Sequence, residues 1–340
     1  MRAAKAASPT AFAFARPRAL ARLRTMNSVE TRRSLVRRCA SVTDELSADQ
    51  CKALLEVAQR AAEAGGEVIW DAVDKPRNIE FKGATDLVTQ TDKDAEKAIL
   101  GVIMAAYGEE HGVLGEEGGV YGNASSEYLW CVDPLDGTTN FAHSYPSFAA
   151  SVAVLYKARP VAACVVAFGG GPHSWSSAVY TAAKGNGAYC NGNRISVSDV
   201  SDLQQSLLVT GFGYDHGAAW SCNLDLFRHF TDVTQGVRRL GAAAVDMCLV
   251  AMGVNDAYWE FDLKPWDMAA GALMIEEAGG KVTTMDGKDF TAFDKTILAS
   301  NSTKLHEAIQ EKTGPAVADL ASKGVEFERW FIPEGYAQWL

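Results

Sequence analysis

The sequence contains no run of about 20 uninterrupted apolar residues, so no segment is expected to span a membrane as a helix. None of its seven cysteines belongs to a C-x-x-C motif, and neither the cysteines nor the six histidines show the spacing of a zinc site or disulfide framework. The chain also lacks a G-x-S-x-G elbow, a cysteine-nucleophile signature and the Lys-Ser/Thr of a P-loop. Any catalysis must therefore depend on other residue types.

Basic residues are scarce after the first 43 positions. The whole chain of 340 residues has 32 Lys and Arg against 42 Asp and Glu. Residues 1–43 contain ten of those bases and a single acid, which gives +9 and leaves 22 bases and 41 acids, or −19, for the remainder. With this negative charge, the part of the chain after residue 43 is expected to bind nucleic acid and anionic membranes poorly. Its expected partners are cations, or anions that cations bring in.

The N-terminal leader is rich in Ala, Arg and Ser and has no compact apolar segment. This composition is typical of an organellar transit peptide and not of a secretory signal. We therefore expect residues 1–45 to direct import into an organelle, either the chloroplast or the mitochondrion. A solvated arm, or an arm that binds nucleic acid, is the plainer interpretation.

The chain as a whole is 48% apolar, which fits a folded protein with a sizeable core. Ser47 and Gln50 form a capping-box pattern at the start of a helix to about Val73. Strand-like segments dominate residues 128–195, and strands alternate with helices from residue 207, ending with a helix over 302–312. We expect an α+β half over residues 46–197, an α/β half over 198–313 and a C-terminal tail over 314–340 that docks on the surface.

The densest chemical signal is a short buried strand that ends in two carboxylates, Asp133 and Asp136. Pro134 is expected to end the strand in a turn, so that both carboxylates and the Leu135 carbonyl converge on one point. Oxygen ligands of this kind suit Mg²⁺. Residues 137–139 supply backbone N–H groups able to hold a phosphate. Taken alone, the same pattern is also an ordinary turn.

Three further acidic features each have a structural alternative. Glu116 or Glu117 follows an apolar segment and would lie at a strand end, or in an acidic surface turn. Asp267 opens a helix, where it would serve as an N-cap. Asp92 is expected at the first position of a helix beside the cap Thr91, where a purely structural role is the plain interpretation.

Together these segments resemble the inositol monophosphatase family of metal-dependent sugar phosphatases. Four motifs carry the resemblance, in the family's order and over residues 46–313: DLVTQTD (86–92), GEE (115–117), WCVDPLDGTTNF (130–141) and WDMAA (266–270). The leader and the aromatic tail look like the plastid members of plants and algae. The implied fold class is α+β/α/β, a layered αβαβα sandwich in which an antiparallel-sheet N-terminal half packs on a mixed-sheet C-terminal half.

The resemblance also implies roles for individual residues. It makes Glu116, Asp133 and the Leu135 carbonyl ligands of one Mg²⁺, and Asp133, Asp136 and Asp267 ligands of a second; a third, weaker ion near Glu116 is usual in the family. Thr138 and Asp92 match the pair that, with Glu116, orients and deprotonates the attacking water. Other matches, by role, are the phosphate contacts Gly137 and Thr138, the polyol-pocket residues Asp136, Ala243, Glu260 and Asp267, and a lysine near the metals, Lys82.

The implied activity is Mg²⁺-dependent hydrolysis of inositol monophosphate, a small phosphorylated polyol, by a homodimer. Metal ions neutralise a phosphate monoester and acidify a bound water, so a protein nucleophile is not needed. This agrees with the absence of a nucleophile motif. Alternative substrates are galactose 1-phosphate, histidinol phosphate and fructose 1,6-bisphosphate. A metal-binding regulatory protein without hydrolytic activity is the alternative from another class.

Overall fold

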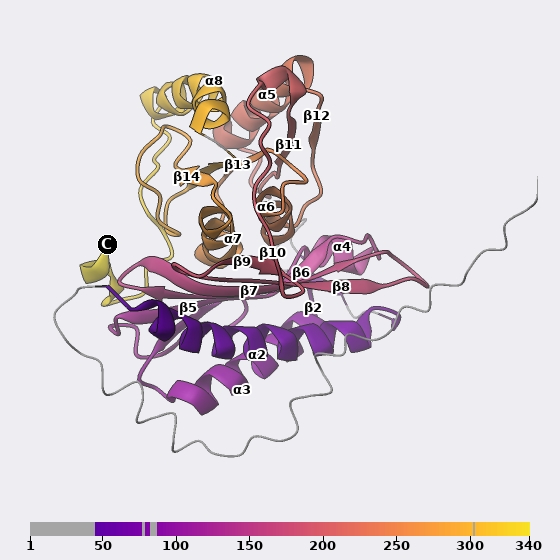
Figure 1. The fold of residues 1–340 in the computed structure, drawn as a ribbon, viewed down its shortest axis with the longest axis vertical. Coiled ribbons are helices and arrows are strands. Elements are labelled where there is room, and N and C mark those ends of the chain that lie inside the picture. Colours follow the sequence, from indigo (N-terminus) through magenta and orange to yellow (C-terminus); the bar gives the residue numbers. More distant parts are fainter. Residues whose placement is uncertain (1–44, 77–78, 82–86, 302) are drawn as a thin grey trace, which may run out of the picture. The chain divides into compact units, whose positions relative to one another are not determined.

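Layers of helices and sheets alternate through the folded part of the chain (Figure 1). The structure, a computed structural model, describes residues 45–76, 79–81, 87–301 and 303–340. Within these ranges, α2 and α3 cover one face of an eight-stranded sheet, and α6 and α7 lie between that sheet and a five-stranded sheet. Helices α5 and α8 cover the outer face of the second sheet. The predicted αβαβα layering is confirmed.

Helix α2 (Ala48–Ala72) begins as the sequence predicts. Ser47 Oγ accepts a hydrogen bond from Gln50 N, and the Gln50 side chain accepts one from Ser47 N, which completes the capping box. Helix α3 (Gln90–Tyr107) packs beside α2. Both helices turn buried aliphatic side chains toward the eight-stranded sheet, because apolar residues recur at helical spacing along them.

The eight-stranded sheet has the order β10-β9-β8-β7-β6-β5-β3-β4. Its strands are β3 (Gly112–Gly115), β4 (Gly119–Gly122), β5 (Tyr128–Asp136), β6 (Phe148–Tyr156), β7 (Arg159–Gly169), β8 (Ser176–Ala183), β9 (Gly187–Cys190) and β10 (Asn193–Arg194). Every pair is antiparallel except β3–β5, which is parallel. The sheet is therefore mixed, and the prediction of an antiparallel sheet was wrong at this one pair.

The five-stranded sheet has the order β12-β11-β13-β15-β14 and combines parallel with antiparallel pairs, as predicted. Its strands are β11 (Leu207–Thr210), β12 (Gly236–Arg238), β13 (Ala257–Phe261), β14 (Lys281–Thr283) and β15 (Thr296–Ser300). A separate hairpin pairs β1 (Ile79–Phe81) with β2 (Leu87–Thr89). The predicted boundary near residue 198 falls between the two large sheets, and the division into halves stays a prediction, since residues 46–340 pack as one compact unit.

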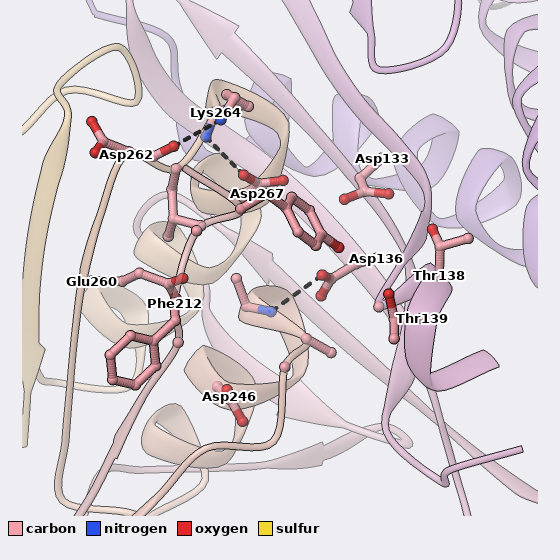
Figure 2. Close-up of a pocket in the computed structure, with 18 of the residues that line it drawn as sticks. Asp133, Asp136, Thr138, Thr139, Phe212, Asp246, Glu260, Asp262, Lys264 and Asp267 are labelled. Carbon is pink, nitrogen blue, oxygen red and sulfur yellow. Dashed lines mark hydrogen bonds between the residues drawn. The ribbon is translucent and has the colours of Figure 1, made fainter. Parts of the chain in front are cut away.

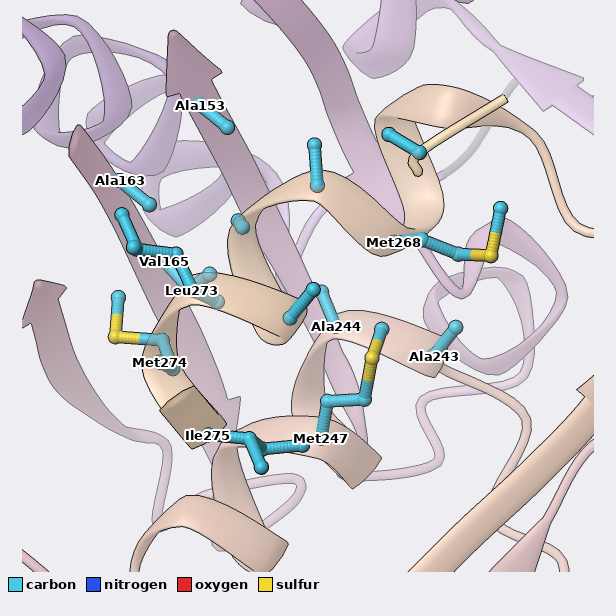
Figure 3. Close-up of a cluster of buried hydrophobic side chains, with 14 of the residues drawn as sticks. Ala153, Ala163, Val165, Ala243, Ala244, Met247, Met268, Leu273, Met274 and Ile275 are labelled. Carbon is cyan, nitrogen blue, oxygen red and sulfur yellow. The ribbon is translucent and has the colours of Figure 1, made fainter. Parts of the chain in front are cut away.

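The middle layer, α6 (Ala243–Ala251) and α7 (Pro265–Glu277), is buried on almost every side. Its side chains face strands of the first sheet, including Val165 of β7 (Figure 3). A Cβ on Gly271 of α7 would lie 2.5 Å from the Met247 Cβ of α6, so glycine lets the two helices approach closely. This packing fixes the N-termini of both helices at the same end of the layer.

The outer layer consists of α5 (Ala218–Val233) and α8 (Thr303–Ser322). Helix α8 ends ten residues later than predicted, because Val317 and Leu320 continue its buried face beyond Pro315. Shorter elements are the helix α4 (Thr138–Ala142) and the 3-10 helices η3 (Leu203–Gln205) and η4 (Tyr336–Trp339). Among the described residues, none of the helices combines the length and apolar character that a membrane span requires.

Candidate active site

A bulge in β5 brings Asp133 and Asp136 to the same face of the sheet. Asp133 pairs with Ser151 and Asp136 with Ala149, so three steps along β5 match two steps along β6. Without the extra residue, an odd spacing would turn the two carboxylates to opposite faces. The prediction that Pro134 ends the strand was wrong: Pro134 lacks the ladder N–H, and the strand accommodates it as a bulge and continues to Asp136.

The parallel pairing of β3 with β5 brings Glu116 beside Asp133. Gly115 pairs with Val132, and Glu116 N donates to the Val132 carbonyl at 3.1 Å. The predicted strand-end position of Glu116 is confirmed. Glu96 of α3 holds the turn that follows β3, since its carboxylate accepts from Glu117 N at 2.9 Å. Glu96 is buried, with 4% exposure.

Asp267 lies in the first turn of α7. Its Oδ2 accepts from Lys264 N at 2.7 Å, as the third residue of a capping box does. The alternative prediction of Asp267 as the N-cap was wrong, because the N-cap is Lys264. The same side chain also contacts the carboxylate of Asp133. Structural and functional roles are thus compatible in Asp267.

Asp92 of α3 and Thr138, the first residue of α4, form a buried hydrogen-bonded pair. Thr138 Oγ1 lies 2.9 Å from Asp92 Oδ1 and 3.0 Å from the Leu135 carbonyl oxygen. Asp92 Oδ2 accepts from the backbone and hydroxyl of Thr89, which is the true N-cap of α3. The prediction of Thr91 as the cap was wrong, because the capping box places Asp92 third in the helix.

The N-terminus of α6 holds the other carboxylate of the bulge. Asp136 accepts from Ala243 N at 3.2 Å and from Ala244 N at 2.8 Å, which satisfies donors that a helix N-terminus leaves free. Glu260 lies nearby at the end of β13 and accepts a hydrogen bond from the hydroxyl of Tyr258. Three separate elements therefore present acids to one space.

That space is a cavity of about 800 Å³ between β5, α4, α6 and α7 (Figure 2). The sequence-predicted residues that line it are Glu116, Asp133, Leu135, Asp136, Gly137, Thr138, Ala243, Glu260 and Asp267. Asp92 does not line the cavity but is reached through Thr138. Lys82 lies outside the described residues. Gly137 adopts a φ of 83°, and a Cβ there would lie 2.9 Å from the Ser147 carbonyl, so glycine is required where α4 begins.

Burial and mutual repulsion raise the pKa values of the clustered carboxyls. Burial raises the pKa of Asp133 well above its ordinary value, and the carboxylates of Glu116 and Asp136 add to this effect. Burial also raises the pKa of Asp136 to about 7, although the α6 N–H groups oppose the rise. The pKa of Glu260 rises to about 8 for the same reason, and the Tyr258 hydrogen bond opposes it.

This donor set fits hard divalent cations. Asp133, Asp136 and Asp267 are acids that burial makes costly to ionise together, and a bound cation would remove that cost. Within the described ranges, no three His, Cys, Asp or Glu side chains converge as a ready-made metal cage. The carboxyls instead contact one another, as Asp133 does with Glu116 and Asp267. The ligand assignments therefore remain predictions that the chemistry of the donors supports.

Several cavity residues escaped the sequence analysis. Asp246 is 1% exposed, and among the described residues neither of its carboxylate oxygens has a hydrogen-bond partner. It is the one charged residue of the apolar segment that forms α6, which is a signal that was available in the sequence. Lys264 and Arg239 add positive charge to the lining, and Phe212 also lines the cavity (Figure 2).

The layered fold and the acidic cavity can be compared with those of known protein families. A model described as the inositol monophosphatase family matches residues 50–318, and the chain belongs to this family. The chain is accordingly a phosphatase of that family, and its predicted fold class is confirmed.

Individual relatives make the comparison more specific. The chain is 58% identical over 283 residues to "Phosphatase IMPL1, chloroplastic" of Arabidopsis thaliana, covering 83% of this chain and 76% of that protein. It is 40% identical over 263 residues to "Fructose-1,6-bisphosphatase/inositol-1-monophosphatase" of Aquifex aeolicus, covering 77% and 95%. The solved structure of an inositol monophosphatase from Anabaena (Nostoc) sp. PCC 7120 matches with a TM-score of 0.68 and 39% identity, covering 77% and 96%.

Proposed function

We propose that the protein is a Mg²⁺-dependent phosphomonoesterase that hydrolyses inositol monophosphate to inositol and phosphate. The observation that carries the proposal is the convergence of Glu116, Asp133, Asp136 and Asp267 on one cavity beside the Thr138–Asp92 pair. A family phosphatase with these residues needs no protein nucleophile, and the sequence contains no nucleophile motif.

Two or three Mg²⁺ ions are expected in the cavity. Glu116, Asp133 and the Leu135 carbonyl would hold one, and Asp133, Asp136 and Asp267 would hold a second. When bound, Mg²⁺ supplies positive charge that neutralises the phosphate and lowers the pKa of a coordinated water. The bulge in β5 fixes the relative placement of Asp133 and Asp136, so the protein orders both carboxylates before substrate arrives.

Thr138 and Asp92 would manage the proton of the attacking water. The Thr138 hydroxyl donates to Asp92, which leaves the lone pairs of Thr138 Oγ1 available to accept from a water in the cavity. Asp92 is fully buried and held by Thr89, so it fixes the direction of the Thr138 hydroxyl. Gly137 and Thr138 would contact the phosphate at the start of α4, where backbone N–H groups have no partner within the helix.

The polyol would occupy the part of the cavity next to α6 and β13. Asp136, Ala243 and Glu260 line it, with carboxylates able to accept hydrogen bonds from sugar hydroxyls. Fructose 1,6-bisphosphate is a second candidate substrate, because the relative from Aquifex aeolicus carries both activities in its name and Arg239 and Lys264 add cations to the lining. Galactose 1-phosphate and histidinol phosphate complete the set of esters to compare.

The test uses protein that begins at Leu46, because residues 46–340 form a compact unit. It should release phosphate from inositol 1-phosphate with Mg²⁺ and not after chelation, with a higher kcat/KM than for the other three esters. Glu116→Gln should lose activity by at least about 100-fold, because a metal-binding carboxylate becomes a neutral amide. Glu117→Gln is the matched control, since Glu117 does not line the cavity. Full activity in Glu116→Gln would refute the site, and no phosphate release from any ester would refute the hydrolytic function.

We also infer import into the chloroplast and homodimer formation. The basic leader lies outside the described residues except for Glu45, and its composition together with the chloroplastic name of the Arabidopsis relative supports plastid import. A fluorescent fusion of residues 1–45 that stays in the cytosol would contradict the first inference. A monomer mass by light scattering would contradict the second.

A further inference from the structure

The C-terminal segment Arg329–Pro333 lies beside the active-site cavity, although it falls outside the residues that match the family model. Phe331 lines the cavity together with Trp266 and Asp267, and it also lines a second cavity of about 270 Å³ that reaches Glu116. The tail therefore contributes to the wall of the site and does not merely rest on the surface.

Trp330 contacts the turn that carries Asp267. Its indole N–H donates to the Leu263 carbonyl at 2.9 Å, and Lys264 Nζ lies 4.5 Å from the centre of its ring. Lys295 Nζ lies 4.8 Å from the same ring centre. A hydrogen bond and two cation–π contacts thus hold one side chain against the turn.

Phe331 contacts the same turn from the side of the cavity. Its ring meets the ring of Trp266 edge-on, with the centres 5.2 Å apart, and Trp266 directly precedes Asp267. Phe331 adopts a φ of 54°, which a bulky residue rarely takes unless its surroundings hold it there. Asp262, four residues before Trp266, has a φ of 60°. Each of the two segments therefore contains a residue in an unusual backbone conformation.

Both ends of the segment are anchored in the body of the protein. Arg329 Nε lies 3.1 Å from Asp294 Oδ1, and Trp330 N donates to the Phe293 carbonyl at 3.0 Å. Further along, Tyr336 is fully buried, and its hydroxyl accepts from Ala158 N at 3.0 Å. Segment and turn therefore cannot move independently without breaking these contacts.

We propose that the segment Arg329–Pro333 is a clamp that positions Asp267, with Trp330 holding Leu263 and Lys264 and Phe331 holding Trp266. The inference rests on the proposed function, in which Asp267 is a Mg²⁺ ligand. Asp267 accepts from Lys264 N, so a shift of Lys264 moves the carboxylate with it. Mg²⁺ demands near-ideal geometry with ligand distances of about 2.0–2.1 Å, so a displacement of a few tenths of an ångström weakens binding.

The test compares two Trp→Phe substitutions in the same tail. Trp330→Phe keeps an aromatic ring and removes the donor to Leu263. Trp339→Phe is the matched control, because Trp339 has a comparable cation–π contact with Lys157, at 5.5 Å, and does not line the cavity. The Kd for Mg²⁺ is measured by calorimetry without substrate, and kcat is measured across Mg²⁺ concentrations with inositol 1-phosphate.

Trp330→Phe should raise the Kd for Mg²⁺ about tenfold, the scale for residues that orient a metal ligand, and should recover most of kcat at saturating Mg²⁺. Trp339→Phe should leave both values within twofold of the unchanged protein. An unchanged Kd in Trp330→Phe overturns the clamp, and so does an equal loss in both variants, which would indicate general destabilisation. If the unchanged protein binds no Mg²⁺ and releases no phosphate, the proposed function itself fails, which is a distinct result.

Discussion

Lowering the pH should remove stability that neutral His111 contributes to the fold. The imidazole is 8% exposed and stacks between the rings of Tyr107 and Tyr128, with ring centres 4.1 and 4.4 Å away. Its Nδ1 accepts from the Trp130 indole N–H at 3.1 Å, so the neutral ring carries its proton on Nε2. A second proton would have to enter at Nδ1, which would break this hydrogen bond and bury a charge.

Burial lowers the pKa of His111 from its ordinary 6.5 to about 4. The unfolded chain therefore binds a proton near pH 6.5 and the folded chain only near pH 4, so the free energy of unfolding falls as the pH drops between these values. The full difference corresponds to about 3.4 kcal/mol, and about 2 kcal/mol of it is lost between pH 7.5 and pH 5.0.

The assay is urea unfolding of the unchanged protein and of His111→Asn at both pH values. Asparagine keeps an acceptor for the Trp130 N–H and does not titrate, and carboxyls elsewhere affect both proteins alike. His111→Asn should be the less stable protein at pH 7.5, and its deficit should shrink by about 2 kcal/mol at pH 5.0. A deficit that changes by less than about 0.5 kcal/mol would refute the reasoning, because the folded and unfolded pKa values of His111 would then have to be nearly equal.

Two further substitutions test the site. Thr138→Val should lower kcat with inositol 1-phosphate about 100-fold, since it removes the hydroxyl that donates to Asp92. Thr138→Ser keeps the hydroxyl and should retain most activity. Equal kcat values for the two variants in a phosphate-release assay would contradict this. Asp246→Asn should raise the free energy of unfolding by about 1–3 kcal/mol, because it neutralises a buried carboxylate whose oxygens have no hydrogen-bond partner among the described residues. A lower urea midpoint at an unchanged m-value would show instead that the Asp246 charge stabilises the fold.

The parts of the fold that local chemistry determines were predictable from the sequence. The capping box of Ser47 and the apolar strand segments of β5, β6 and β7 are confirmed in place. The end of α8 was not predictable in the same way. Pro315 reads locally as a helix stop, and only packing against the second sheet shows why Val317 and Leu320 continue the helix.

In the site, too, local sequence predicted some features, and others depend on tertiary packing. Asp133 and Asp136 were recognisable as a motif, but the bulge that turns them to one face depends on the register of β6, which the sequence does not display. Glu116 was expected at a strand end, yet its position beside Asp133 depends on a parallel pairing within a largely antiparallel sheet. The contact of Phe331 with Trp266 joins residues 65 positions apart, and no local pattern predicts it.

The clustered carboxylates of the cavity give part of the net negative charge of the chain a specific role. A fold gains nothing from burying Asp133, Asp136 and Asp267 together, because burial raises the free energy needed to ionise each of them, and the other two raise it further for Asp133. Binding of Mg²⁺ to the folded state alone would reverse that cost, since a ligand that prefers the folded protein stabilises it by mass action. The carboxylates that destabilise the metal-free protein would then hold the Mg²⁺ ions, and these ions would attract the anionic substrate. The same negative charge from which we expect poor binding of nucleic acid would therefore create, inside the cavity, a need for metal ions.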